Sequence, residues 1–385
     1  MERSDAKRTV PRPIRIIPAP DSVRDVIEAR QAHLLERGGV MRSAAAYEKL
    51  KWSVFEDLRR RVPPDPGAAR ALALTGHLLP SVGPYQNPDH LLALVLHVTE
   101  LLHTTDLMGQ DWQIDQDLVL ASSGAGMFNA FTTSFRDERC HLLMFNDGLF
   151  LFAQIFGNIL TELFFEESGE SLRYAVASIL GFVTMGSPRH LLGGLPERFQ
   201  SAARNVFTDV ILRFVIAHEL GHVNLGHTST RTRSATGPSN VGLASVAWTE
   251  ELEADAYASA VAATDSARHS NPSWFSGLLT ELAQAVQVLI DDTIDLLSGP
   301  VLGEGSSVAR THPPGTTRML NVQRALNELA ARDPALHLVA EEHDRANRFL
   351  EVLRERIART GQQAIDAGVG PHITWLNART AGHPH

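Results

Sequence analysis

The sequence predicts an α+β fold that is predominantly helical, with a small β-sheet beside a cleft. Apolar residues recur at helical spacing along most of the chain, which favours helices. Residues 117–150 depart from this pattern, because short apolar and β-favouring runs alternate there with glycines. The 385 residues are 44% hydrophobic and 21% charged, which is typical of a chain that buries a core.

The same pattern divides the chain into four regions. Residues 1–20 contain four prolines and are expected to form an extended or disordered tail. Residues 21–105 form an N-terminal helical region, and residues 332–385 form a C-terminal helical region. Residues 106–331 form the domain that contains the strands and the chemical motifs described below.

Start and stop signals place the individual helices. Asp21 can cap a helix that ends near Glu36, and a second helix from Ser43 to Val62 ends before two prolines. Residues 63–89 are expected to be rich in loops, because proline- and glycine-containing segments there separate one short apolar run. Further helices are expected over Leu91–Leu102, Leu149–Glu167, Ser171–Phe182, Phe199–Leu225, Thr249–Ala263, Ser276–Leu297, Thr316–Ala331 and Glu341–Ala367.

Charge and cysteine content exclude several classes of protein. The formal net charge of −9 argues against a nucleic-acid partner, because phosphate binding needs a basic surface. The single cysteine, Cys140, cannot form an internal disulfide, which fits a reducing compartment such as the cytoplasm. No apolar run reaches the ~20 residues of a membrane span, and the N-terminus lacks the apolar stretch of a secretion signal. The oligomeric state does not follow from the sequence.

The motif with the clearest chemistry is His218-Glu219-Leu220-Gly221-His222, within an apolar helix. Residues four apart lie on one face of a helix, so the two imidazoles can bind one metal ion. Glu219 is left free to act as a general base on a water molecule. The alternative interpretation is a chance match on an amphipathic helix.

A third ligand is available in the segment TEELEADAYASA. Glu251 and Asp255 share a helix face, so Glu251 can bind the metal while Asp255 accepts the N–H of a histidine ligand. Glu250 and Glu253 project elsewhere and are expected to be solvated. An acidic first turn also suits the helix dipole, so the cluster has a purely structural explanation as well.

Other conspicuous residues favour structural roles. His227 is rotated off the ligand face, and no acidic or cysteine partner follows His90, His97 and His103 at ligand spacing. Cys140 and His141 are adjacent in a predicted strand, so they should point to opposite faces rather than form a nucleophile and base. The preferred interpretation of Tyr257 is a tyrosine in the core or at the rim of the cleft.

The motifs together resemble a known family. HELGH followed by ELEAD resembles the gluzincin zinc metallopeptidases of the CAAX prenyl endopeptidase and bacterial heat-shock membrane protease type. Residues 311–318 (THPPGTTR) are similar to the family's S/T-HPPxxxR segment, and residues 128–131 (FNAF) are similar to its NAFxxG strand. These segments occur in the family's order between about residues 117 and 330.

The resemblance implies a zinc-dependent endopeptidase, here without membrane spans. It assigns one Zn²⁺ per chain to His218, His222 and Glu251, with Asp255 behind a histidine ligand and Glu219 as the general base. It also implies that a protein or peptide substrate lies extended along a strand.

The remaining residues implied by the resemblance lie around that strand and the proline segment. Asn129, Ala130 and Phe131 would contact the substrate. His312 and Arg318 would stabilise the oxyanion or orient the metal-binding carboxylates. The chain departs from the family at Thr132–Phe135, where a glycine is common, and in an insertion-like stretch at residues 166–200.

Two other classes of function stay open on the sequence. The metal can be structural or sensory, in a regulatory protein that binds a partner without cutting it. Alternatively, the HExxH helix can be a metal-free packing element of an interaction protein. Retention of Glu219 disfavours the structural metal, because such a site needs no free base. Residues 228–248 could also gate a latent enzyme.

Overall fold

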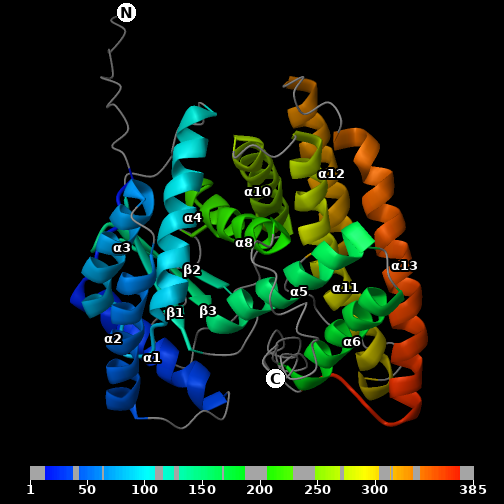
Figure 1. The fold of residues 1–385 in the computed structure, drawn as a ribbon, viewed down its shortest axis with the longest axis horizontal. Helices are drawn as coiled ribbons and strands as arrows, with labels where there is room; N and C mark the ends of the chain where they lie inside the picture. Colours follow the sequence, from blue (N-terminus) through cyan, green and yellow to red (C-terminus); the bar gives the residue numbers. More distant parts are fainter. Residues whose placement is uncertain are drawn as a thin grey trace, which may run out of the picture.

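The computed structural model describes residues 14–37, 43–62, 65–108, 116–124, 130–166, 169–186, 206–228, 248–268, 273–302, 313, 315–332 and 339–372. These residues form a mainly helical structure with one small sheet, as the sequence predicts (Figure 1). The strands are β1 (Asp117–Ser123), β2 (Ala130–Phe135) and β3 (Cys140–Asn146). The helices are α1 (Asp21–Arg37), α2 (Ala44–Arg61), α3 (Pro66–Leu78), α4 (Pro88–Leu107), α5 (Asp147–Glu166), α6 (Gly169–Met185), α8 (Val206–Asn224), α10 (Trp248–Arg268), α11 (Ser273–Leu302), α12 (Gly315–Arg332) and α13 (Val339–Asp366).

The sheet has the order β1-β3-β2, with β1 parallel and β2 antiparallel to the central strand. All seven residues of β3 are buried, because the sheet is covered on both faces. A short parallel bridge between Ile16 and Leu118 covers the outer edge of β1. Within the part of the chain that the structure describes, no strand pairs with the outer edge of β2, which is therefore an edge strand.

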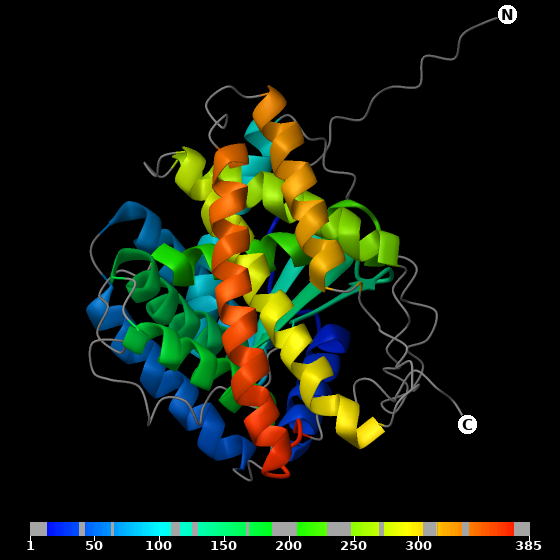
Figure 2. The same ribbon diagram turned by 90° about the vertical axis from the view of Figure 1, so that its right-hand side faces the viewer.

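Helix α8 lies in the middle of the molecule. In Figure 1 the helices α1 to α4 lie on one side of α8 and α11 to α13 on the other, while α10 packs directly against α8. Figure 2 shows the molecule turned by 90°, with α11 and α13 towards the viewer. The apolar sequence of α8 explains its position, because residues such as Phe207, Phe214 and Ile216 are buried on several faces of the helix. Buried residues from Ala19 to Ile357 belong to one continuous core.

A group of charges around the buried Arg213 and Asp265 fixes the first half of α8 against its neighbours. Arg213 contacts Asp265 of α10, and its guanidinium lies 2.8 Å from Glu100 Oε2 of α4 and 2.9 Å from Asp209 Oδ2. Thr104 of α4 donates a hydrogen bond of 2.7 Å to the other oxygen of Asp265. These contacts fix α4, α8 and α10 relative to one another. They lie one to two helical turns before His218 of the HExxH motif.

The prediction that residues 63–89 are mostly loop was wrong for the apolar run, because α3 occupies Pro66–Leu78. The side chain of Asp65 accepts a hydrogen bond of 2.9 Å from the Ala68 amide, and Pro66 takes the first helical position. Asp followed by Pro is a helix start as well as a turn signal, and the apolar residues that follow supply a buried face. Elsewhere the described helices agree with the expected ranges within about five residues, and the expected start of one helix at Phe199 lies outside the described residues. The four-region division of the chain stays a prediction.

No helix among the described residues is long and apolar enough to cross a membrane.

We predict that acidification destabilises the fold partly through His141. Burial in β3 lowers the pKa of His141 from 6.5 to about 4, so the unfolded chain binds a proton that the folded chain excludes. Stability is therefore fully present above the unfolded pKa and falls as the pH drops from about 6.5 towards 4. The loss from this residue between pH 7.5 and pH 5 is about 2 kcal/mol.

Urea unfolding of wild type and His141→Asn at pH 7.5 and pH 5 measures this loss. Asparagine can keep a hydrogen bond to the Thr228 hydroxyl, which lies 3.2 Å from His141 Nδ1, but it does not titrate. The variant should lose less stability than wild type on acidification. Equal losses would show that His141 does not control the acid response.

Candidate metal centre

Three buried ligand atoms from two helices converge on one point. His218 and His222 lie four residues apart on α8, and their Nε2 atoms are 3.1 Å apart. Glu251 of α10 lies 3.4 Å from each of these nitrogens, with Oε2 facing His218 and Oε1 facing His222. Their burial and mutual distances make this group able to hold a metal ion.

The separations also match those between metal ligands. Two atoms bound at about 2.0–2.1 Å to one tetrahedral ion lie about 3.3 Å apart. The three separations here are 3.1, 3.4 and 3.4 Å. Two imidazoles and one carboxylate are a ligand set that leaves a fourth position for water or substrate. The residues present therefore fit a metal site with an open position.

The outer nitrogen of His218 is held by a buried carboxylate. Asp255 Oδ1 lies 2.9 Å from His218 Nδ1, so this nitrogen carries the proton and Nε2 points to the other ligands. Arg318 of α12 donates two hydrogen bonds, of 2.7 and 2.6 Å, to the same carboxylate. Burial raises the pKa of Asp255, but Arg318 and His218 outweigh it and hold the pKa below its usual range.

The buried carboxylates around His218 favour its protonated form. Burial alone lowers the pKa of His218, but hydrogen bonds to Asp255 and Glu251 outweigh burial and raise the pKa to about 10. Burial lowers the pKa of His222, which is therefore neutral. A divalent cation can replace this proton, because it supplies the positive charge that the carboxylates need.

His222 has a support that the sequence did not predict. His227 Nδ1 lies 3.0 Å from His222 Nδ1, and His227 Nε2 lies 3.0 Å from Glu253 Oε2. One arrangement of protons satisfies these three side chains: His222 donates to His227, and His227 donates to Glu253. His227 is not one of the converging ligands and the Glu253 side chain is 55% exposed, as the sequence predicts, but the spacing does not indicate their contact. His227 comes close because α8 ends at Asn224 and Gly226 adopts a φ of +76°, which turns the chain back.

Helices α8 and α10 approach closely at the ligands because Gly221 has no side chain. A Cβ at this position would lie 3.0 Å from Tyr257 Cδ1 and 3.2 Å from Ala254 Cα, both on α10. The Tyr257 hydroxyl lies 3.0 Å from Thr105 Oγ1 of α4, and burial raises the pKa of this phenol. Tyr257 thus packs in the core between α4, α8 and α10.

Glu219 lies beside the ligands without joining them. Its side chain is partly exposed, and Thr132 of β2 donates a hydrogen bond to Oε2. Within the described residues this is the one hydrogen bond that the Glu219 side chain makes. The contact brings the edge strand β2 next to α8, the helix that carries His218 and His222.

The remaining predicted residues divide into two groups. Ala130 and Phe131 lie on β2, and the Arg30 guanidinium carbon is 5.6 Å from the centre of the Phe131 ring. Asn129 and His312 lie outside the described residues. Arg318 is buried and bound to Asp255, which corresponds to the orienting role and not to the oxyanion role.

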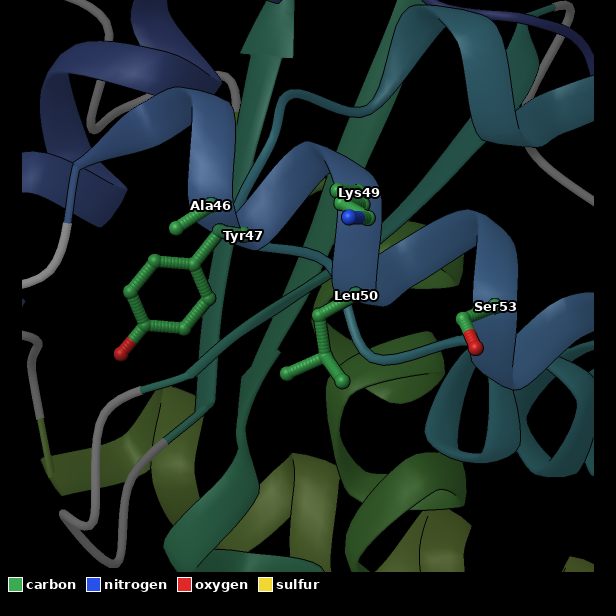
Figure 3. A pocket seen from close by; sticks show the side chains of 5 residues that line it. All are labelled: Ala46, Tyr47, Lys49, Leu50 and Ser53. Atoms are coloured by element: carbon green, nitrogen blue, oxygen red, sulfur yellow. The ribbon is translucent and has the colours of Figure 1, made fainter.

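Other candidate groups lack a metal-binding set within the described residues. His90 pairs with Asp147 at 2.6 Å and stacks on Phe150. Burial raises the pKa of the Cys140 thiol to about 11, so it stays protonated at neutral pH. Figure 3 shows a surface hollow on α2 that shares no residue with the metal-binding group; its lining residues are Ala46, Tyr47, Lys49, Leu50 and Ser53.

Comparisons with protein-family profiles, curated proteins and solved structures gave no match to this chain.

We predict that metal affinity depends on Glu251 strongly and on His227 moderately. Titration with Zn²⁺ as the probe metal should show loss of high-affinity binding in Glu251→Ala. His227→Ala should weaken binding about 10- to 100-fold, because it releases the outer nitrogen of His222. Glu250→Ala is the matched control on the same turn and should bind like wild type. Full affinity in Glu251→Ala would mean that the ligand set is wrong.

We also predict that Arg318 matters for stability as well as for metal binding. Arg318→Ala removes the guanidinium that pairs with the buried Asp255 carboxylate, and the loss of one partner of a buried ion pair costs about 3–5 kcal/mol. Chemical denaturation should show this cost, whereas Arg324→Ala on the exposed side of α12 should behave like wild type. If Arg318→Ala is as stable as wild type, the guanidinium of Arg318 does not pair with Asp255 in the folded protein in solution.

Proposed function

We propose that this protein is a zinc-dependent endopeptidase. The observation that carries the proposal is the division of roles between four side chains. His218, His222 and Glu251 present three buried ligand atoms at metal-ligand separations, while Glu219 stands one residue from His218 and binds none of them. A purely structural metal site has no use for a partly exposed carboxylate beside an open position.

Zinc bound by these residues would polarise the scissile carbonyl and lower the pKa of a water molecule towards ~7. Glu219 would accept the proton of the attacking water and pass it to the leaving amine. Asp255 and Arg318 would keep His218 in one tautomer and one orientation throughout. His227 and Glu253 would do the same for His222.

The substrate would be an extended peptide of a protein. The outer edge of β2 offers backbone groups that a peptide strand can pair with, and this strand contacts Glu219 through Thr132. Asn129, Ala130 and Phe131 belong to or precede this strand. His312, which precedes the buried Pro313 and the start of α12, is the candidate donor to the oxyanion on the family resemblance.

The alternative is a metal-binding regulatory protein without proteolytic turnover. It would keep the ligands and their supports, but it would not require Glu219. The two functions therefore predict different effects on the protein's activity when the Glu219 carboxylate is removed.

We predict that Glu219→Gln abolishes cleavage and spares the metal. Glutamine keeps the size of the side chain and can still accept from Thr132, but it cannot take a proton. The rate of cleavage should fall about 10²- to 10⁴-fold, with zinc content and melting temperature unchanged. Zinc-loaded wild type and variant are incubated with a proteome-derived peptide library, and new peptide ends are counted by mass spectrometry.

Glu250→Gln is the control and should cleave like wild type. The same new ends at the same rate from Glu219→Gln would exclude Glu219 as the base. Absence of new ends from zinc-loaded wild type, with full binding of zinc, would favour the regulatory alternative.

A further inference from the structure

A buried threonine on the edge strand contacts the proposed base. Thr132 is 1% exposed and lies in β2, opposite Leu143 of the central strand. Its hydroxyl donates to Glu219 Oε2. The apolar Leu143 side chain offers no partner for this hydroxyl, so Glu219 removes the cost of burying it.

The position of Thr132 follows from the strand. Side chains alternate across a strand, so Thr132 and Ser134 share one face and Thr133 points to the other. Thr132 and Ser134 are both buried, whereas Thr133 is only partly so. Because threonine is branched at Cβ, its χ1 angle is restricted and Oγ1 is held in a defined place.

We propose that Thr132 is a positioning residue for Glu219. Its hydroxyl donates a hydrogen bond to Oε2 of Glu219, so Oε1 is the carboxylate oxygen that is directed at the attacking water. Without this contact the glutamate, a long and partly exposed side chain, would distribute over several rotamers. This inference rests on the proposed function, because it gives Thr132 a role only if Glu219 acts on water.

The contact also links the base to the strand proposed for substrate pairing. Thr132 directly follows Phe131 in β2. A peptide paired with this edge would therefore be separated from Glu219 by the side chain of Thr132. The sequence motif hides this role, since Thr132 falls on a position that the NAFxxG pattern leaves undefined.

The test compares Thr132→Val with Thr132→Ser in the full-length protein loaded with zinc. Valine keeps the shape and removes the hydroxyl, whereas serine keeps the hydroxyl. Thr133→Val is the matched control on the opposite face of the same strand. Acetohydroxamate serves as the probe, because it binds zinc and presents a proton to a nearby carboxylate, and its affinity is measured by calorimetry beside zinc content.

The expected result is about 10-fold weaker acetohydroxamate binding in Thr132→Val, given the strength of hydrogen bonds to charged groups. Thr132→Ser and Thr133→Val should bind within about threefold of wild type, and zinc content should be equal in all variants. With a peptide substrate, Thr132→Val should lower kcat more than it changes KM. If Thr132→Val is unstable, Thr132→Ala against Thr132→Ser isolates the same hydroxyl.

Equal acetohydroxamate binding in Thr132→Val and wild type, while Glu219→Gln weakens it, would overturn the role of Thr132 alone. Failure of Thr132→Ser to restore binding in a folded protein would do the same. If Glu219→Gln leaves acetohydroxamate binding unchanged, or if wild type takes up no zinc, the proposed function fails and Thr132 has no such role.

Discussion

The buried carboxylate of Asp255 is the contact on which the site depends. It comes from α10, accepts from His218 of α8 at 2.9 Å and receives two hydrogen bonds from Arg318 of α12. One side chain therefore ties three helices together and fixes the orientation of the His218 imidazole. A carboxylate that is 0% exposed is stable only with such partners, so the packing of the three helices and the chemistry of the site are set by the same interaction.

The site is asymmetric in how its two histidines are supported. His218 rests on a buried anion that an arginine neutralises, while His222 rests on His227 and through it on Glu253, whose side chain is 55% exposed. The second support therefore ends at solvent, whereas the first is buried. Gly221 allows both arrangements, because it lets α10 approach α8 until Ala254 and Tyr257 lie against the helix backbone. The edge strand β2 completes the surroundings of the candidate site, because Thr132 donates a hydrogen bond to Glu219.

Local spacing made part of this predictable from the sequence. The separation of His218 from His222, and of Glu251 from Asp255, each equals about one helical turn, so helix geometry alone puts each pair on one face. That the two helices face each other does not follow from either spacing. The contacts of His227 with His222, and of Thr132 with Glu219, depend on a turn after α8 and on the position of the sheet, which no local pattern encodes. Helix α3 was missed for the opposite reason, since its Asp-Pro start resembles a turn.

The central claim is that His218, His222 and Glu251 together hold a zinc ion in front of Glu219. Anomalous X-ray diffraction from crystals of the purified protein, recorded above and below the zinc absorption edge, tests it directly. One zinc peak per chain should lie about 2.0–2.2 Å from both Nε2 atoms and from a Glu251 oxygen. The nearest oxygen of Glu219 should lie beyond bonding distance. A zinc peak bound by other side chains, or no peak between these three residues in zinc-soaked crystals, would contradict the claim.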